Sequence, residues 1–138
     1  MILSIFPSLL SYAFFVPSLL RATVAVFFAY QVIYHFKQKE QVALQFTQYF
    51  SWVSASFVST LAWLLIVAEV AVGILLFVGA WTQAAALVAA IGFIKLAYFC
   101  DKLPTYAPFP RSTYFLLAVL SLSIVVLGAG AFAFDLPL

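Results

Sequence analysis

The sequence predicts an all-α integral membrane protein: a four-helix bundle with a short N-terminal helix that lies in the membrane interface or re-enters the membrane. Of the 138 residues, 67% are hydrophobic and 7% are charged, and the mean hydropathy is +1.21. Soluble domains have about 25% charged residues, so this chain could not cover a surface exposed to water. A helix needs about 20 apolar residues to cross the hydrocarbon. The length therefore allows four or five crossings, in one domain over residues 1–138.

The first apolar segment is too short to span the membrane. Pro7 and Pro17 bracket the stretch SLLSYAFFV, which fits a short helix lying on the membrane or partly inside it. Whether residues 3–16 span, re-enter or lie on the membrane stays open. Four longer apolar stretches follow, and they predict spanning helices over about residues 17–36, 57–79, 84–100 and 113–132.

Two polar stretches separate these spans on one side of the bundle. KQKEQVALQFTQYFSW (37–52) predicts a helix in the headgroup region, and the proline-rich DKLPTYAPFPRS (101–112) is expected to leave the membrane. This side collects most of the cations: Lys37, Lys39, Lys102 and Arg111. The positive-inside rule then places the 37–56 and 101–112 loops in the cytoplasm. Short loops and the absence of asparagine, hence of glycosylation sites, fit a bacterial inner (plasma) membrane.

Three ionisable residues fall within the predicted spans: Arg21, Glu69 and Lys95. Glu69 precedes the tight turn at 79–83 by roughly 18 Å of helix and Lys95 follows it by roughly 21 Å, so antiparallel neighbours bring the two to a similar depth. Arg21 is offset from Glu69 by about 6 Å, a distance that its long side chain can cover. We therefore expect an Arg–Glu–Lys network with one net positive charge.

One alternative is that Glu69 is a lone carboxylate with unrelated partners, in which case no network forms. If the network forms, it has two interpretations. It is either a buried ion pair that fixes the register of the helices, because unpaired charges are avoided at the bilayer centre, or a site whose excess positive charge receives a quinone or another anionic or carbonyl-bearing ligand. A role for Lys95 as a Schiff-base lysine that holds a chromophore is set aside, because four short helices offer little room around it. No metal site is expected: His35 has no second histidine in the chain and is interpreted as a solvated helix end. Cys100 lies at a helix C-terminus, whose negative pole opposes a reactive thiolate.

Two further patterns concern packing and the interface. Small residues line the third span at Ala85, Ala86, Ala89, Ala90 and Gly92, which favours close helix packing inside the bundle or between copies. An interfacial aromatic belt is expected from Trp52, Trp63, Tyr98, Tyr106 and Tyr114.

The sequence resembles the DoxX family of small membrane proteins. The runs that carry the resemblance are LLRATVAVFF (19–28), AEVAVGILLFVGAWTQAAAL (68–87) and VVLGAGAFAFDLPL (125–138), and together they extend it over about residues 17–138. The positions that match the family's pattern are Arg21, Glu69, Gly73, Gly79, Thr82, Gly128, Gly130 and Asp135. The chain departs from the family in AYQVIYHFK (29–37), where many members carry His-Gly and a Lys.

The resemblance implies a four-helix membrane bundle and a link to membrane redox chemistry, since the family takes its name from a subunit of a thiosulfate:quinone oxidoreductase. The first functional hypothesis is therefore a membrane subunit of a quinone-linked redox system, with a quinone near Arg21, Glu69 and Lys95 and electrons supplied by a partner. The second is a non-catalytic scaffold or accessory subunit, and the third is a small transporter or channel formed by an oligomer. Whether the chain is itself an enzyme stays open.

The expected partners follow from the same observations. They are the lipid bilayer and either other membrane or redox subunits or further copies of this chain. No covalently bound cofactor is expected, and quinone is the candidate for a cofactor bound without a covalent bond. Nucleic acid is not expected, because the net charge is only +2 and no soluble domain is present to bind it.

Overall fold

The computed structural model describes residues 15–128 and residue 130. This part of the chain consists of helices and connecting turns, without strands, which confirms the all-α prediction. The helices are α2 (Phe15–Lys37), α3 (Lys39–Tyr49), α4 (Ala55–Val78), α5 (Thr82–Phe99) and α6 (Arg111–Leu127). The short helix expected within residues 3–16 falls outside the described residues, apart from Phe15 and Val16, which belong to α2.

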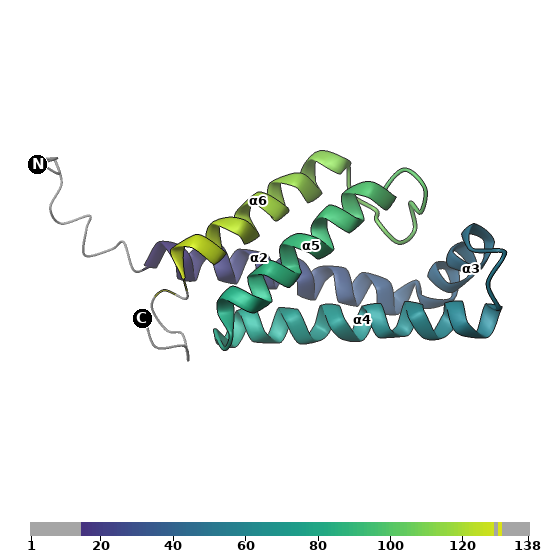
Figure 1. Ribbon diagram of the computed structural model, residues 1–138, viewed down its shortest axis with the longest axis horizontal. Coiled ribbons are helices and arrows are strands. Elements are labelled where there is room, and N and C mark those ends of the chain that lie inside the picture. The colour runs from purple at the N-terminus through teal and green to yellow at the C-terminus, as the bar shows by residue number, and fades with distance from the viewer. Residues whose placement is uncertain (1–14, 129, 131–138) are drawn as a thin grey trace, which may run out of the picture.

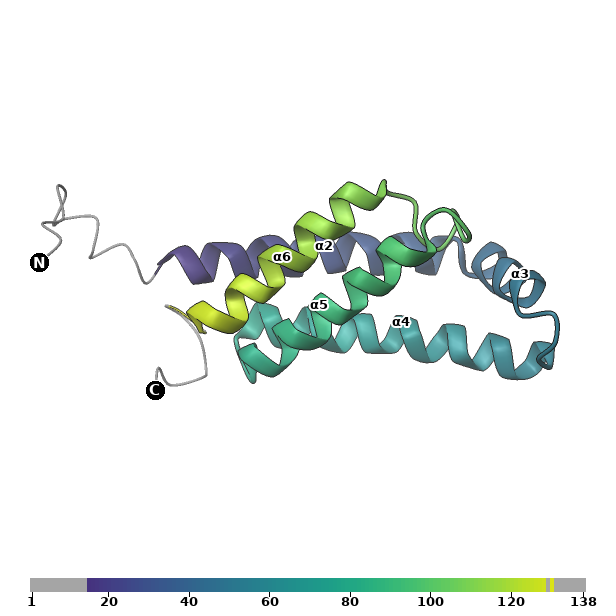
Figure 2. The ribbon, with the colours of Figure 1, turned by 45° about the horizontal axis from the view of Figure 1, so that its top comes forward.

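The four longer helices pack in a ring. α2 contacts α4 and α6, and α5 contacts the same two helices, with the α5–α6 pair the most extensive. Figure 1 shows α5 and α6 running side by side and crossing α2 and α4 obliquely, and Figure 2 shows the same arrangement from a second direction. Four of the small residues predicted to favour close packing, Ala85, Ala86, Ala89 and Ala90 of α5, are buried.

Three of these helices are long and apolar enough to cross a membrane: α2, α4 and α5. Helix α6 is apolar but has 17 residues, about 26 Å of helix, so the fourth crossing stays a prediction. The outward faces carry large apolar side chains, for example Leu64, Val67 and Ile74 of α4. Such a surface suits lipid rather than water.

The α4–α5 connection is the tight turn that the sequence predicted. Gly79 has φ of 76°, in the left-handed region where glycine has no Cβ to clash, and its N–H donates to the Leu75 carbonyl at 2.8 Å. Trp81 is also left-handed, with φ of 51°, and α5 begins at the next residue. The two helices therefore run antiparallel.

The α5–α6 connection (residues 100–110) is partly buried in the protein core. Leu103, Tyr106 and Ala107 are all at most 2% exposed, so the loop folds back into the core between the helices. Its backbone is held by bonds from Leu103 N to Phe99 O and from Tyr106 N to Leu103 O, and its two ends are joined by an Asp101–Arg111 ion pair. A proline-rich loop that satisfies its own backbone in this way can enter a buried layer.

Helix α3 is the short polar helix that was expected between the first two spans. It buries Val42 and Phe46 and packs against α4 and the end of α2. It also touches the 100–110 loop, because the Thr105 N–H donates to Gln45 Oε1 at 3.1 Å. The two polar stretches of the sequence therefore meet at one end of the molecule.

Candidate functional site

The candidate site begins with the buried stripes of α2 and α4. The buried positions of α2 are Pro17, Arg21, Val24, Ala25, Phe28, Gln31 and His35, and those of α4 are Val58, Ala62, Ile66, Glu69, Val72 and Leu76. Spacings of three and four residues put each set on one face of its helix. Polar side chains on these stripes are thus forced into the core, where they need partners.

His35 and Glu69 meet where the two stripes face each other. His35 Nδ1 lies 2.8 Å from Glu69 Oε2, and His35 Nε2 lies 2.7 Å from the Tyr106 carbonyl oxygen. His35 is fully buried and Glu69 is 7% exposed. Because a carbonyl oxygen accepts but never donates, the proton on Nε2 is fixed there.

One proton then remains for the contact between Nδ1 and Oε2. If it sits on Nδ1, the pair is imidazolium and carboxylate; if it sits on Oε2, the pair is imidazole and carboxylic acid. Both forms have no net charge, which suits a buried position between apolar helices. The pair can therefore hold or pass one proton without placing a net charge in the core.

Tyr106 connects this pair to Lys95. The Lys95 ammonium donates to the Tyr106 hydroxyl at 2.7 Å, and the hydroxyl donates to Glu69 Oε1 at 3.4 Å. Lys95 is half-buried, whereas Tyr106 is 1% exposed. The hydrogen bonds thus form a directed chain from a partly exposed ammonium to a buried carboxylate.

Aromatic packing fixes the ring of Tyr106. It stacks on the His35 imidazole with ring centres 4.9 Å apart and planes at 10°, and Phe46 of α3 meets it edge-on at 4.8 Å. Burial raises the pKa of the Tyr106 hydroxyl well above its ordinary value of 10.0, and the neighbouring Glu69 carboxylate raises it further. Tyr106 therefore acts as a neutral donor and acceptor.

The structure brings together two of the three charged residues predicted for the site. Glu69 and Lys95 lie at a similar depth, as expected, and both contact the Tyr106 hydroxyl. Arg21 is buried on α2 about four helical turns, or roughly 21 Å, before His35. His35 of α2 contacts Glu69, and the predicted Arg21–Glu69–Lys95 network is not confirmed.

Three other residues were interpreted wrongly from the sequence. His35 is not a solvated helix end but a core residue with both ring nitrogens engaged. Tyr106 and Tyr114 are not part of an interfacial belt, since both are at most 1% exposed, whereas Trp52, Trp63 and Tyr98 are exposed as expected. The spacing of His35 from Val24, Phe28 and Gln31 was a signal of burial, because it continues one helix face.

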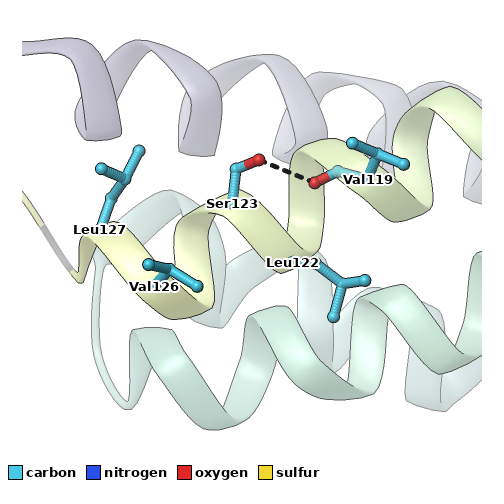
Figure 3. A pocket seen from close by; sticks show the side chains of 5 residues that line it. All are labelled: Val119, Leu122, Ser123, Val126 and Leu127. Atoms are coloured by element: carbon cyan, nitrogen blue, oxygen red, sulfur yellow. Dashed lines mark hydrogen bonds between the residues drawn. The ribbon is translucent and has the colours of Figure 1, made fainter.

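A separate groove lies on the half of α6 that ends at Leu127 (Figure 3). It has a volume of about 430 Å³ and is open and mostly apolar. The hydroxyl of Ser123 donates to the Val119 carbonyl at 2.9 Å, so it is already engaged. The lining residues are Val119, Leu122, Ser123, Val126 and Leu127. This groove suits an acyl chain better than a polar headgroup.

In the described part of the chain, no three His, Cys, Asp or Glu side chains gather closely enough to hold a metal ion. The thiol of Cys100 is buried and donates to the Ala97 carbonyl at 3.2 Å. The hydrogen bonds within the cluster of His35, Glu69, Lys95 and Tyr106 suit it to proton transfer.

Comparisons with known proteins agree with the resemblance seen in the sequence. The family model described as DoxX matches residues 16–100, which include Arg21, His35, Glu69 and Lys95. No curated protein and no solved structure matches the chain. The match covers more than half of the 138 residues, and together with its apolar helices it makes this chain an integral membrane protein that belongs to the DoxX family.

Proposed function

We propose that this chain is a membrane subunit of a quinone-linked redox system, in which the cluster of His35, Glu69, Lys95 and Tyr106 exchanges protons with a quinone. The observation that carries the proposal is the 2.8 Å contact between His35 Nδ1 and Glu69 Oε2 and its connection, through the Tyr106 hydroxyl, to the half-buried Lys95 ammonium. This arrangement connects the buried His35–Glu69 pair, which holds a proton, to Lys95, which a ligand can reach.

The donor set fits a quinone headgroup. Reduction of a quinone to a quinol takes up two electrons and two protons, and a positioned cation stabilises the negative charge that develops on a carbonyl oxygen. The Lys95 ammonium supplies that cation at the edge of the cluster. In this proposal a partner redox protein supplies the electrons. A chain with one cysteine cannot supply them by oxidising two of its own thiols to an internal disulfide.

Each residue of the cluster has a distinct role in this proposal. Lys95 binds the headgroup and donates to it, and Tyr106 orients Lys95 and links it to Glu69. Glu69 and His35 hold the next proton as a neutral pair. General acid–base groups of this kind must lie within hydrogen-bond reach of one another, and the distances of 2.7, 2.8 and 3.4 Å meet that condition.

The proposal includes an orientation and a membrane arrangement. Helices α2, α4, α5 and α6 form a four-helix bundle across a bacterial inner membrane, with α3 and the 100–110 loop at the cytoplasmic end. The support is that both polar segments meet at one end and that this end carries Lys37, Lys39, Lys102 and Arg111. Protons then reach the cluster from the cytoplasmic side.

A non-catalytic accessory subunit is the second candidate, and the closure of the cluster favours it. His35 and Tyr106 are fully satisfied by hydrogen bonds within the chain. In this second interpretation the cluster has a purely structural role: it fixes the register of α2 against α4. The exposed apolar faces then bind other subunits or further copies of this chain.

Native mass spectrometry of the protein released gently from its own membrane separates the two candidates. Quinone-linked function predicts an adduct with the mass of a quinone that disappears in Lys95→Met and persists in the control Lys102→Met, since Lys102 is an exposed lysine bound to Tyr98. An accessory role predicts co-released protein subunits and no quinone adduct. A quinone adduct that is equally abundant in Lys95→Met contradicts the proposed site.

A further inference from the structure

Gln31 is a buried amide without a partner in the described part of the chain. Its side chain is fully buried on α2, and neither its nitrogen nor its oxygen forms a hydrogen bond. It was not singled out from the sequence, and none of the contacts in the cluster of His35, Glu69, Lys95 and Tyr106 uses it. Its position is nevertheless one helical turn before His35, on the same buried stripe.

A polar group in this state is rare in folded proteins. More than about 90% of buried polar groups have a hydrogen-bond partner, and an apolar side chain of the same size avoids the desolvation penalty altogether. In a membrane helix an unpaired polar side chain is even less favourable, because lipid supplies no hydrogen-bond partners. The amide of Gln31 therefore indicates a ligand with which it pairs.

The neighbours of Gln31 show where that ligand lies. About one turn before Gln31 on α2, Phe28 packs on Phe93 with ring centres 4.8 Å apart. A Cβ at Gly73 of α4 would lie 3.3 Å from Phe28 Cβ. About one turn after Gln31 on α2, His35 contacts Glu69, which is one turn before Gly73 on α4. Gln31 thus lies between an apolar layer and the His35–Glu69 pair, within about 6 Å of rise from His35.

We propose that Gln31 is a ligand-binding residue that holds a hydroxyl group beside Glu69. The amide nitrogen donates to the oxygen of this hydroxyl, and the amide oxygen accepts its proton or that of a second hydroxyl. Glu69 can accept as well, because an ionised carboxylate has about four acceptor sites and each of its oxygens has one hydrogen-bond contact within the described part of the chain. The site connects the shared proton of His35 and Glu69 to an exchangeable group.

The amide selects the chemistry of the occupant. A quinone carbonyl accepts but does not donate, so it leaves the oxygen of Gln31 without a partner. A hydroxyl both donates and accepts, and it comes either from an internal water molecule or from the headgroup of a quinol. The quinol source rests on the proposed function, whereas the water source does not.

The test is the thermal unfolding of Gln31→Met in quinone-free lipid nanodiscs, with and without added ubiquinol-2. Methionine is close in size, apolar and a good helix former, and Gln48→Met, at an exposed position of α3, is the matched control. A water-held site predicts that Gln31→Met lowers the midpoint by about 4 °C or more, with no change in Gln48→Met. A quinol-held site predicts that ubiquinol-2 raises the midpoint of the wild type and of Gln48→Met but not that of Gln31→Met.

The inference is overturned if Gln31→Met unfolds at or above the midpoint of the wild type and ubiquinol-2 shifts both proteins equally or shifts neither. If ubiquinol-2 does not change the unfolding midpoint of the wild type and Gln31→Met still has a lower midpoint, the result supports the hydroxyl site and argues against the quinone proposal. If Gln31→Met does not fold, a density map of the wild type decides. Ordered density within hydrogen-bond distance of both amide atoms supports the site, and apolar contacts on all sides exclude it.

Discussion

His35 Nδ1 and Glu69 Oε2 lie 2.8 Å apart, and the Tyr106 carbonyl already takes the proton on the other ring nitrogen of His35. The two side chains come from different helices and meet in a layer with almost no exposure. They therefore share one proton as a neutral pair, and the stability and chemistry of the site depend on that proton.

Replacement of Glu69 by glutamine is expected to preserve the fold and to abolish proton exchange. The glutamine amide can donate to Nδ1 of a neutral imidazole, and its oxygen can accept from the Tyr106 hydroxyl. The free energy of unfolding should change by less than about 1 kcal/mol. Glu69→Leu, in contrast, leaves both partners unsatisfied and should cost about 1–3 kcal/mol. Unfolding in a mixed-micelle titration distinguishes the two, and equal losses in both variants contradict the hydrogen-bond assignment.

Replacement of Tyr106 by phenylalanine keeps the stacking on His35 but removes the hydroxyl between Lys95 and Glu69. We expect a loss of about 1 kcal/mol of unfolding free energy at pH 8.

The same variant has a defined pH dependence. The pKa of Tyr106 is raised in the folded state from its ordinary value of 10.0, so the unfolded chain loses the proton first. The stability of the wild type is then fully present below about pH 10 and falls above it, by up to about 1.4 kcal/mol per pH unit. Tyr106→Phe lacks this loss, so the two stability curves should converge above pH 10. Curves that stay parallel from pH 8 to pH 11 exclude a buried, neutral Tyr106.

Two helix glycines form a matched pair that tests the packing of α2 on α4. Gly73→Ala puts a Cβ 3.3 Å from Phe28 Cβ, whereas Gly92→Ala meets nothing within 4 Å. Alanine is favoured over glycine in a helix interior by about 0.5–1 kcal/mol, so Gly92→Ala should stabilise the protein by that amount. Gly73→Ala should be less stable than Gly92→Ala, because the close approach of the helices offsets the gain. Equal stabilities contradict the close approach of α2 and α4 at Gly73.

The helices and their approximate ends were predictable from the sequence because long apolar runs have few alternatives in lipid. The predicted spans 17–36, 57–79 and 84–100 correspond to Phe15–Lys37, Ala55–Val78 and Thr82–Phe99. The similar depth of Glu69 and Lys95 followed from the short turn between their helices. The family was also predictable, on motifs within the matched residues 16–100.

The partner of Glu69 on α2 was not predicted, and the reason is helix register. Arg21 was matched to Glu69 on the assumption that α2 and α4 end at the same level. In the structure α3 packs against α4, and α4 extends past the end of α2 on that side (Figure 1). His35 consequently lies opposite Glu69, near the end of one helix and the middle of the other.

The role of Tyr106 could not be read from periodicity. It lies between prolines in a connection without helical spacing, and its burial depends on α3, whose Phe46 and Gln45 hold the loop in place. Such contacts between segments distant in the sequence have no local signal. Gln31, in contrast, shares the buried stripe with Phe28 and His35, and that spacing was available in the sequence.

The state of the shared proton can be measured directly, because His35 is the one histidine in the chain. Nitrogen-15 NMR of histidine-labelled protein in lipid reports both ring nitrogens without an assignment problem. The account predicts that Nε2 carries a proton in every folded sample, and that Nδ1 shows a strong hydrogen bond in the wild type. In Glu69→Gln, Nδ1 should become a plain acceptor while Nε2 stays protonated. An imidazole that averages between its two neutral tautomers, and does not respond to Glu69→Gln, contradicts the shared proton.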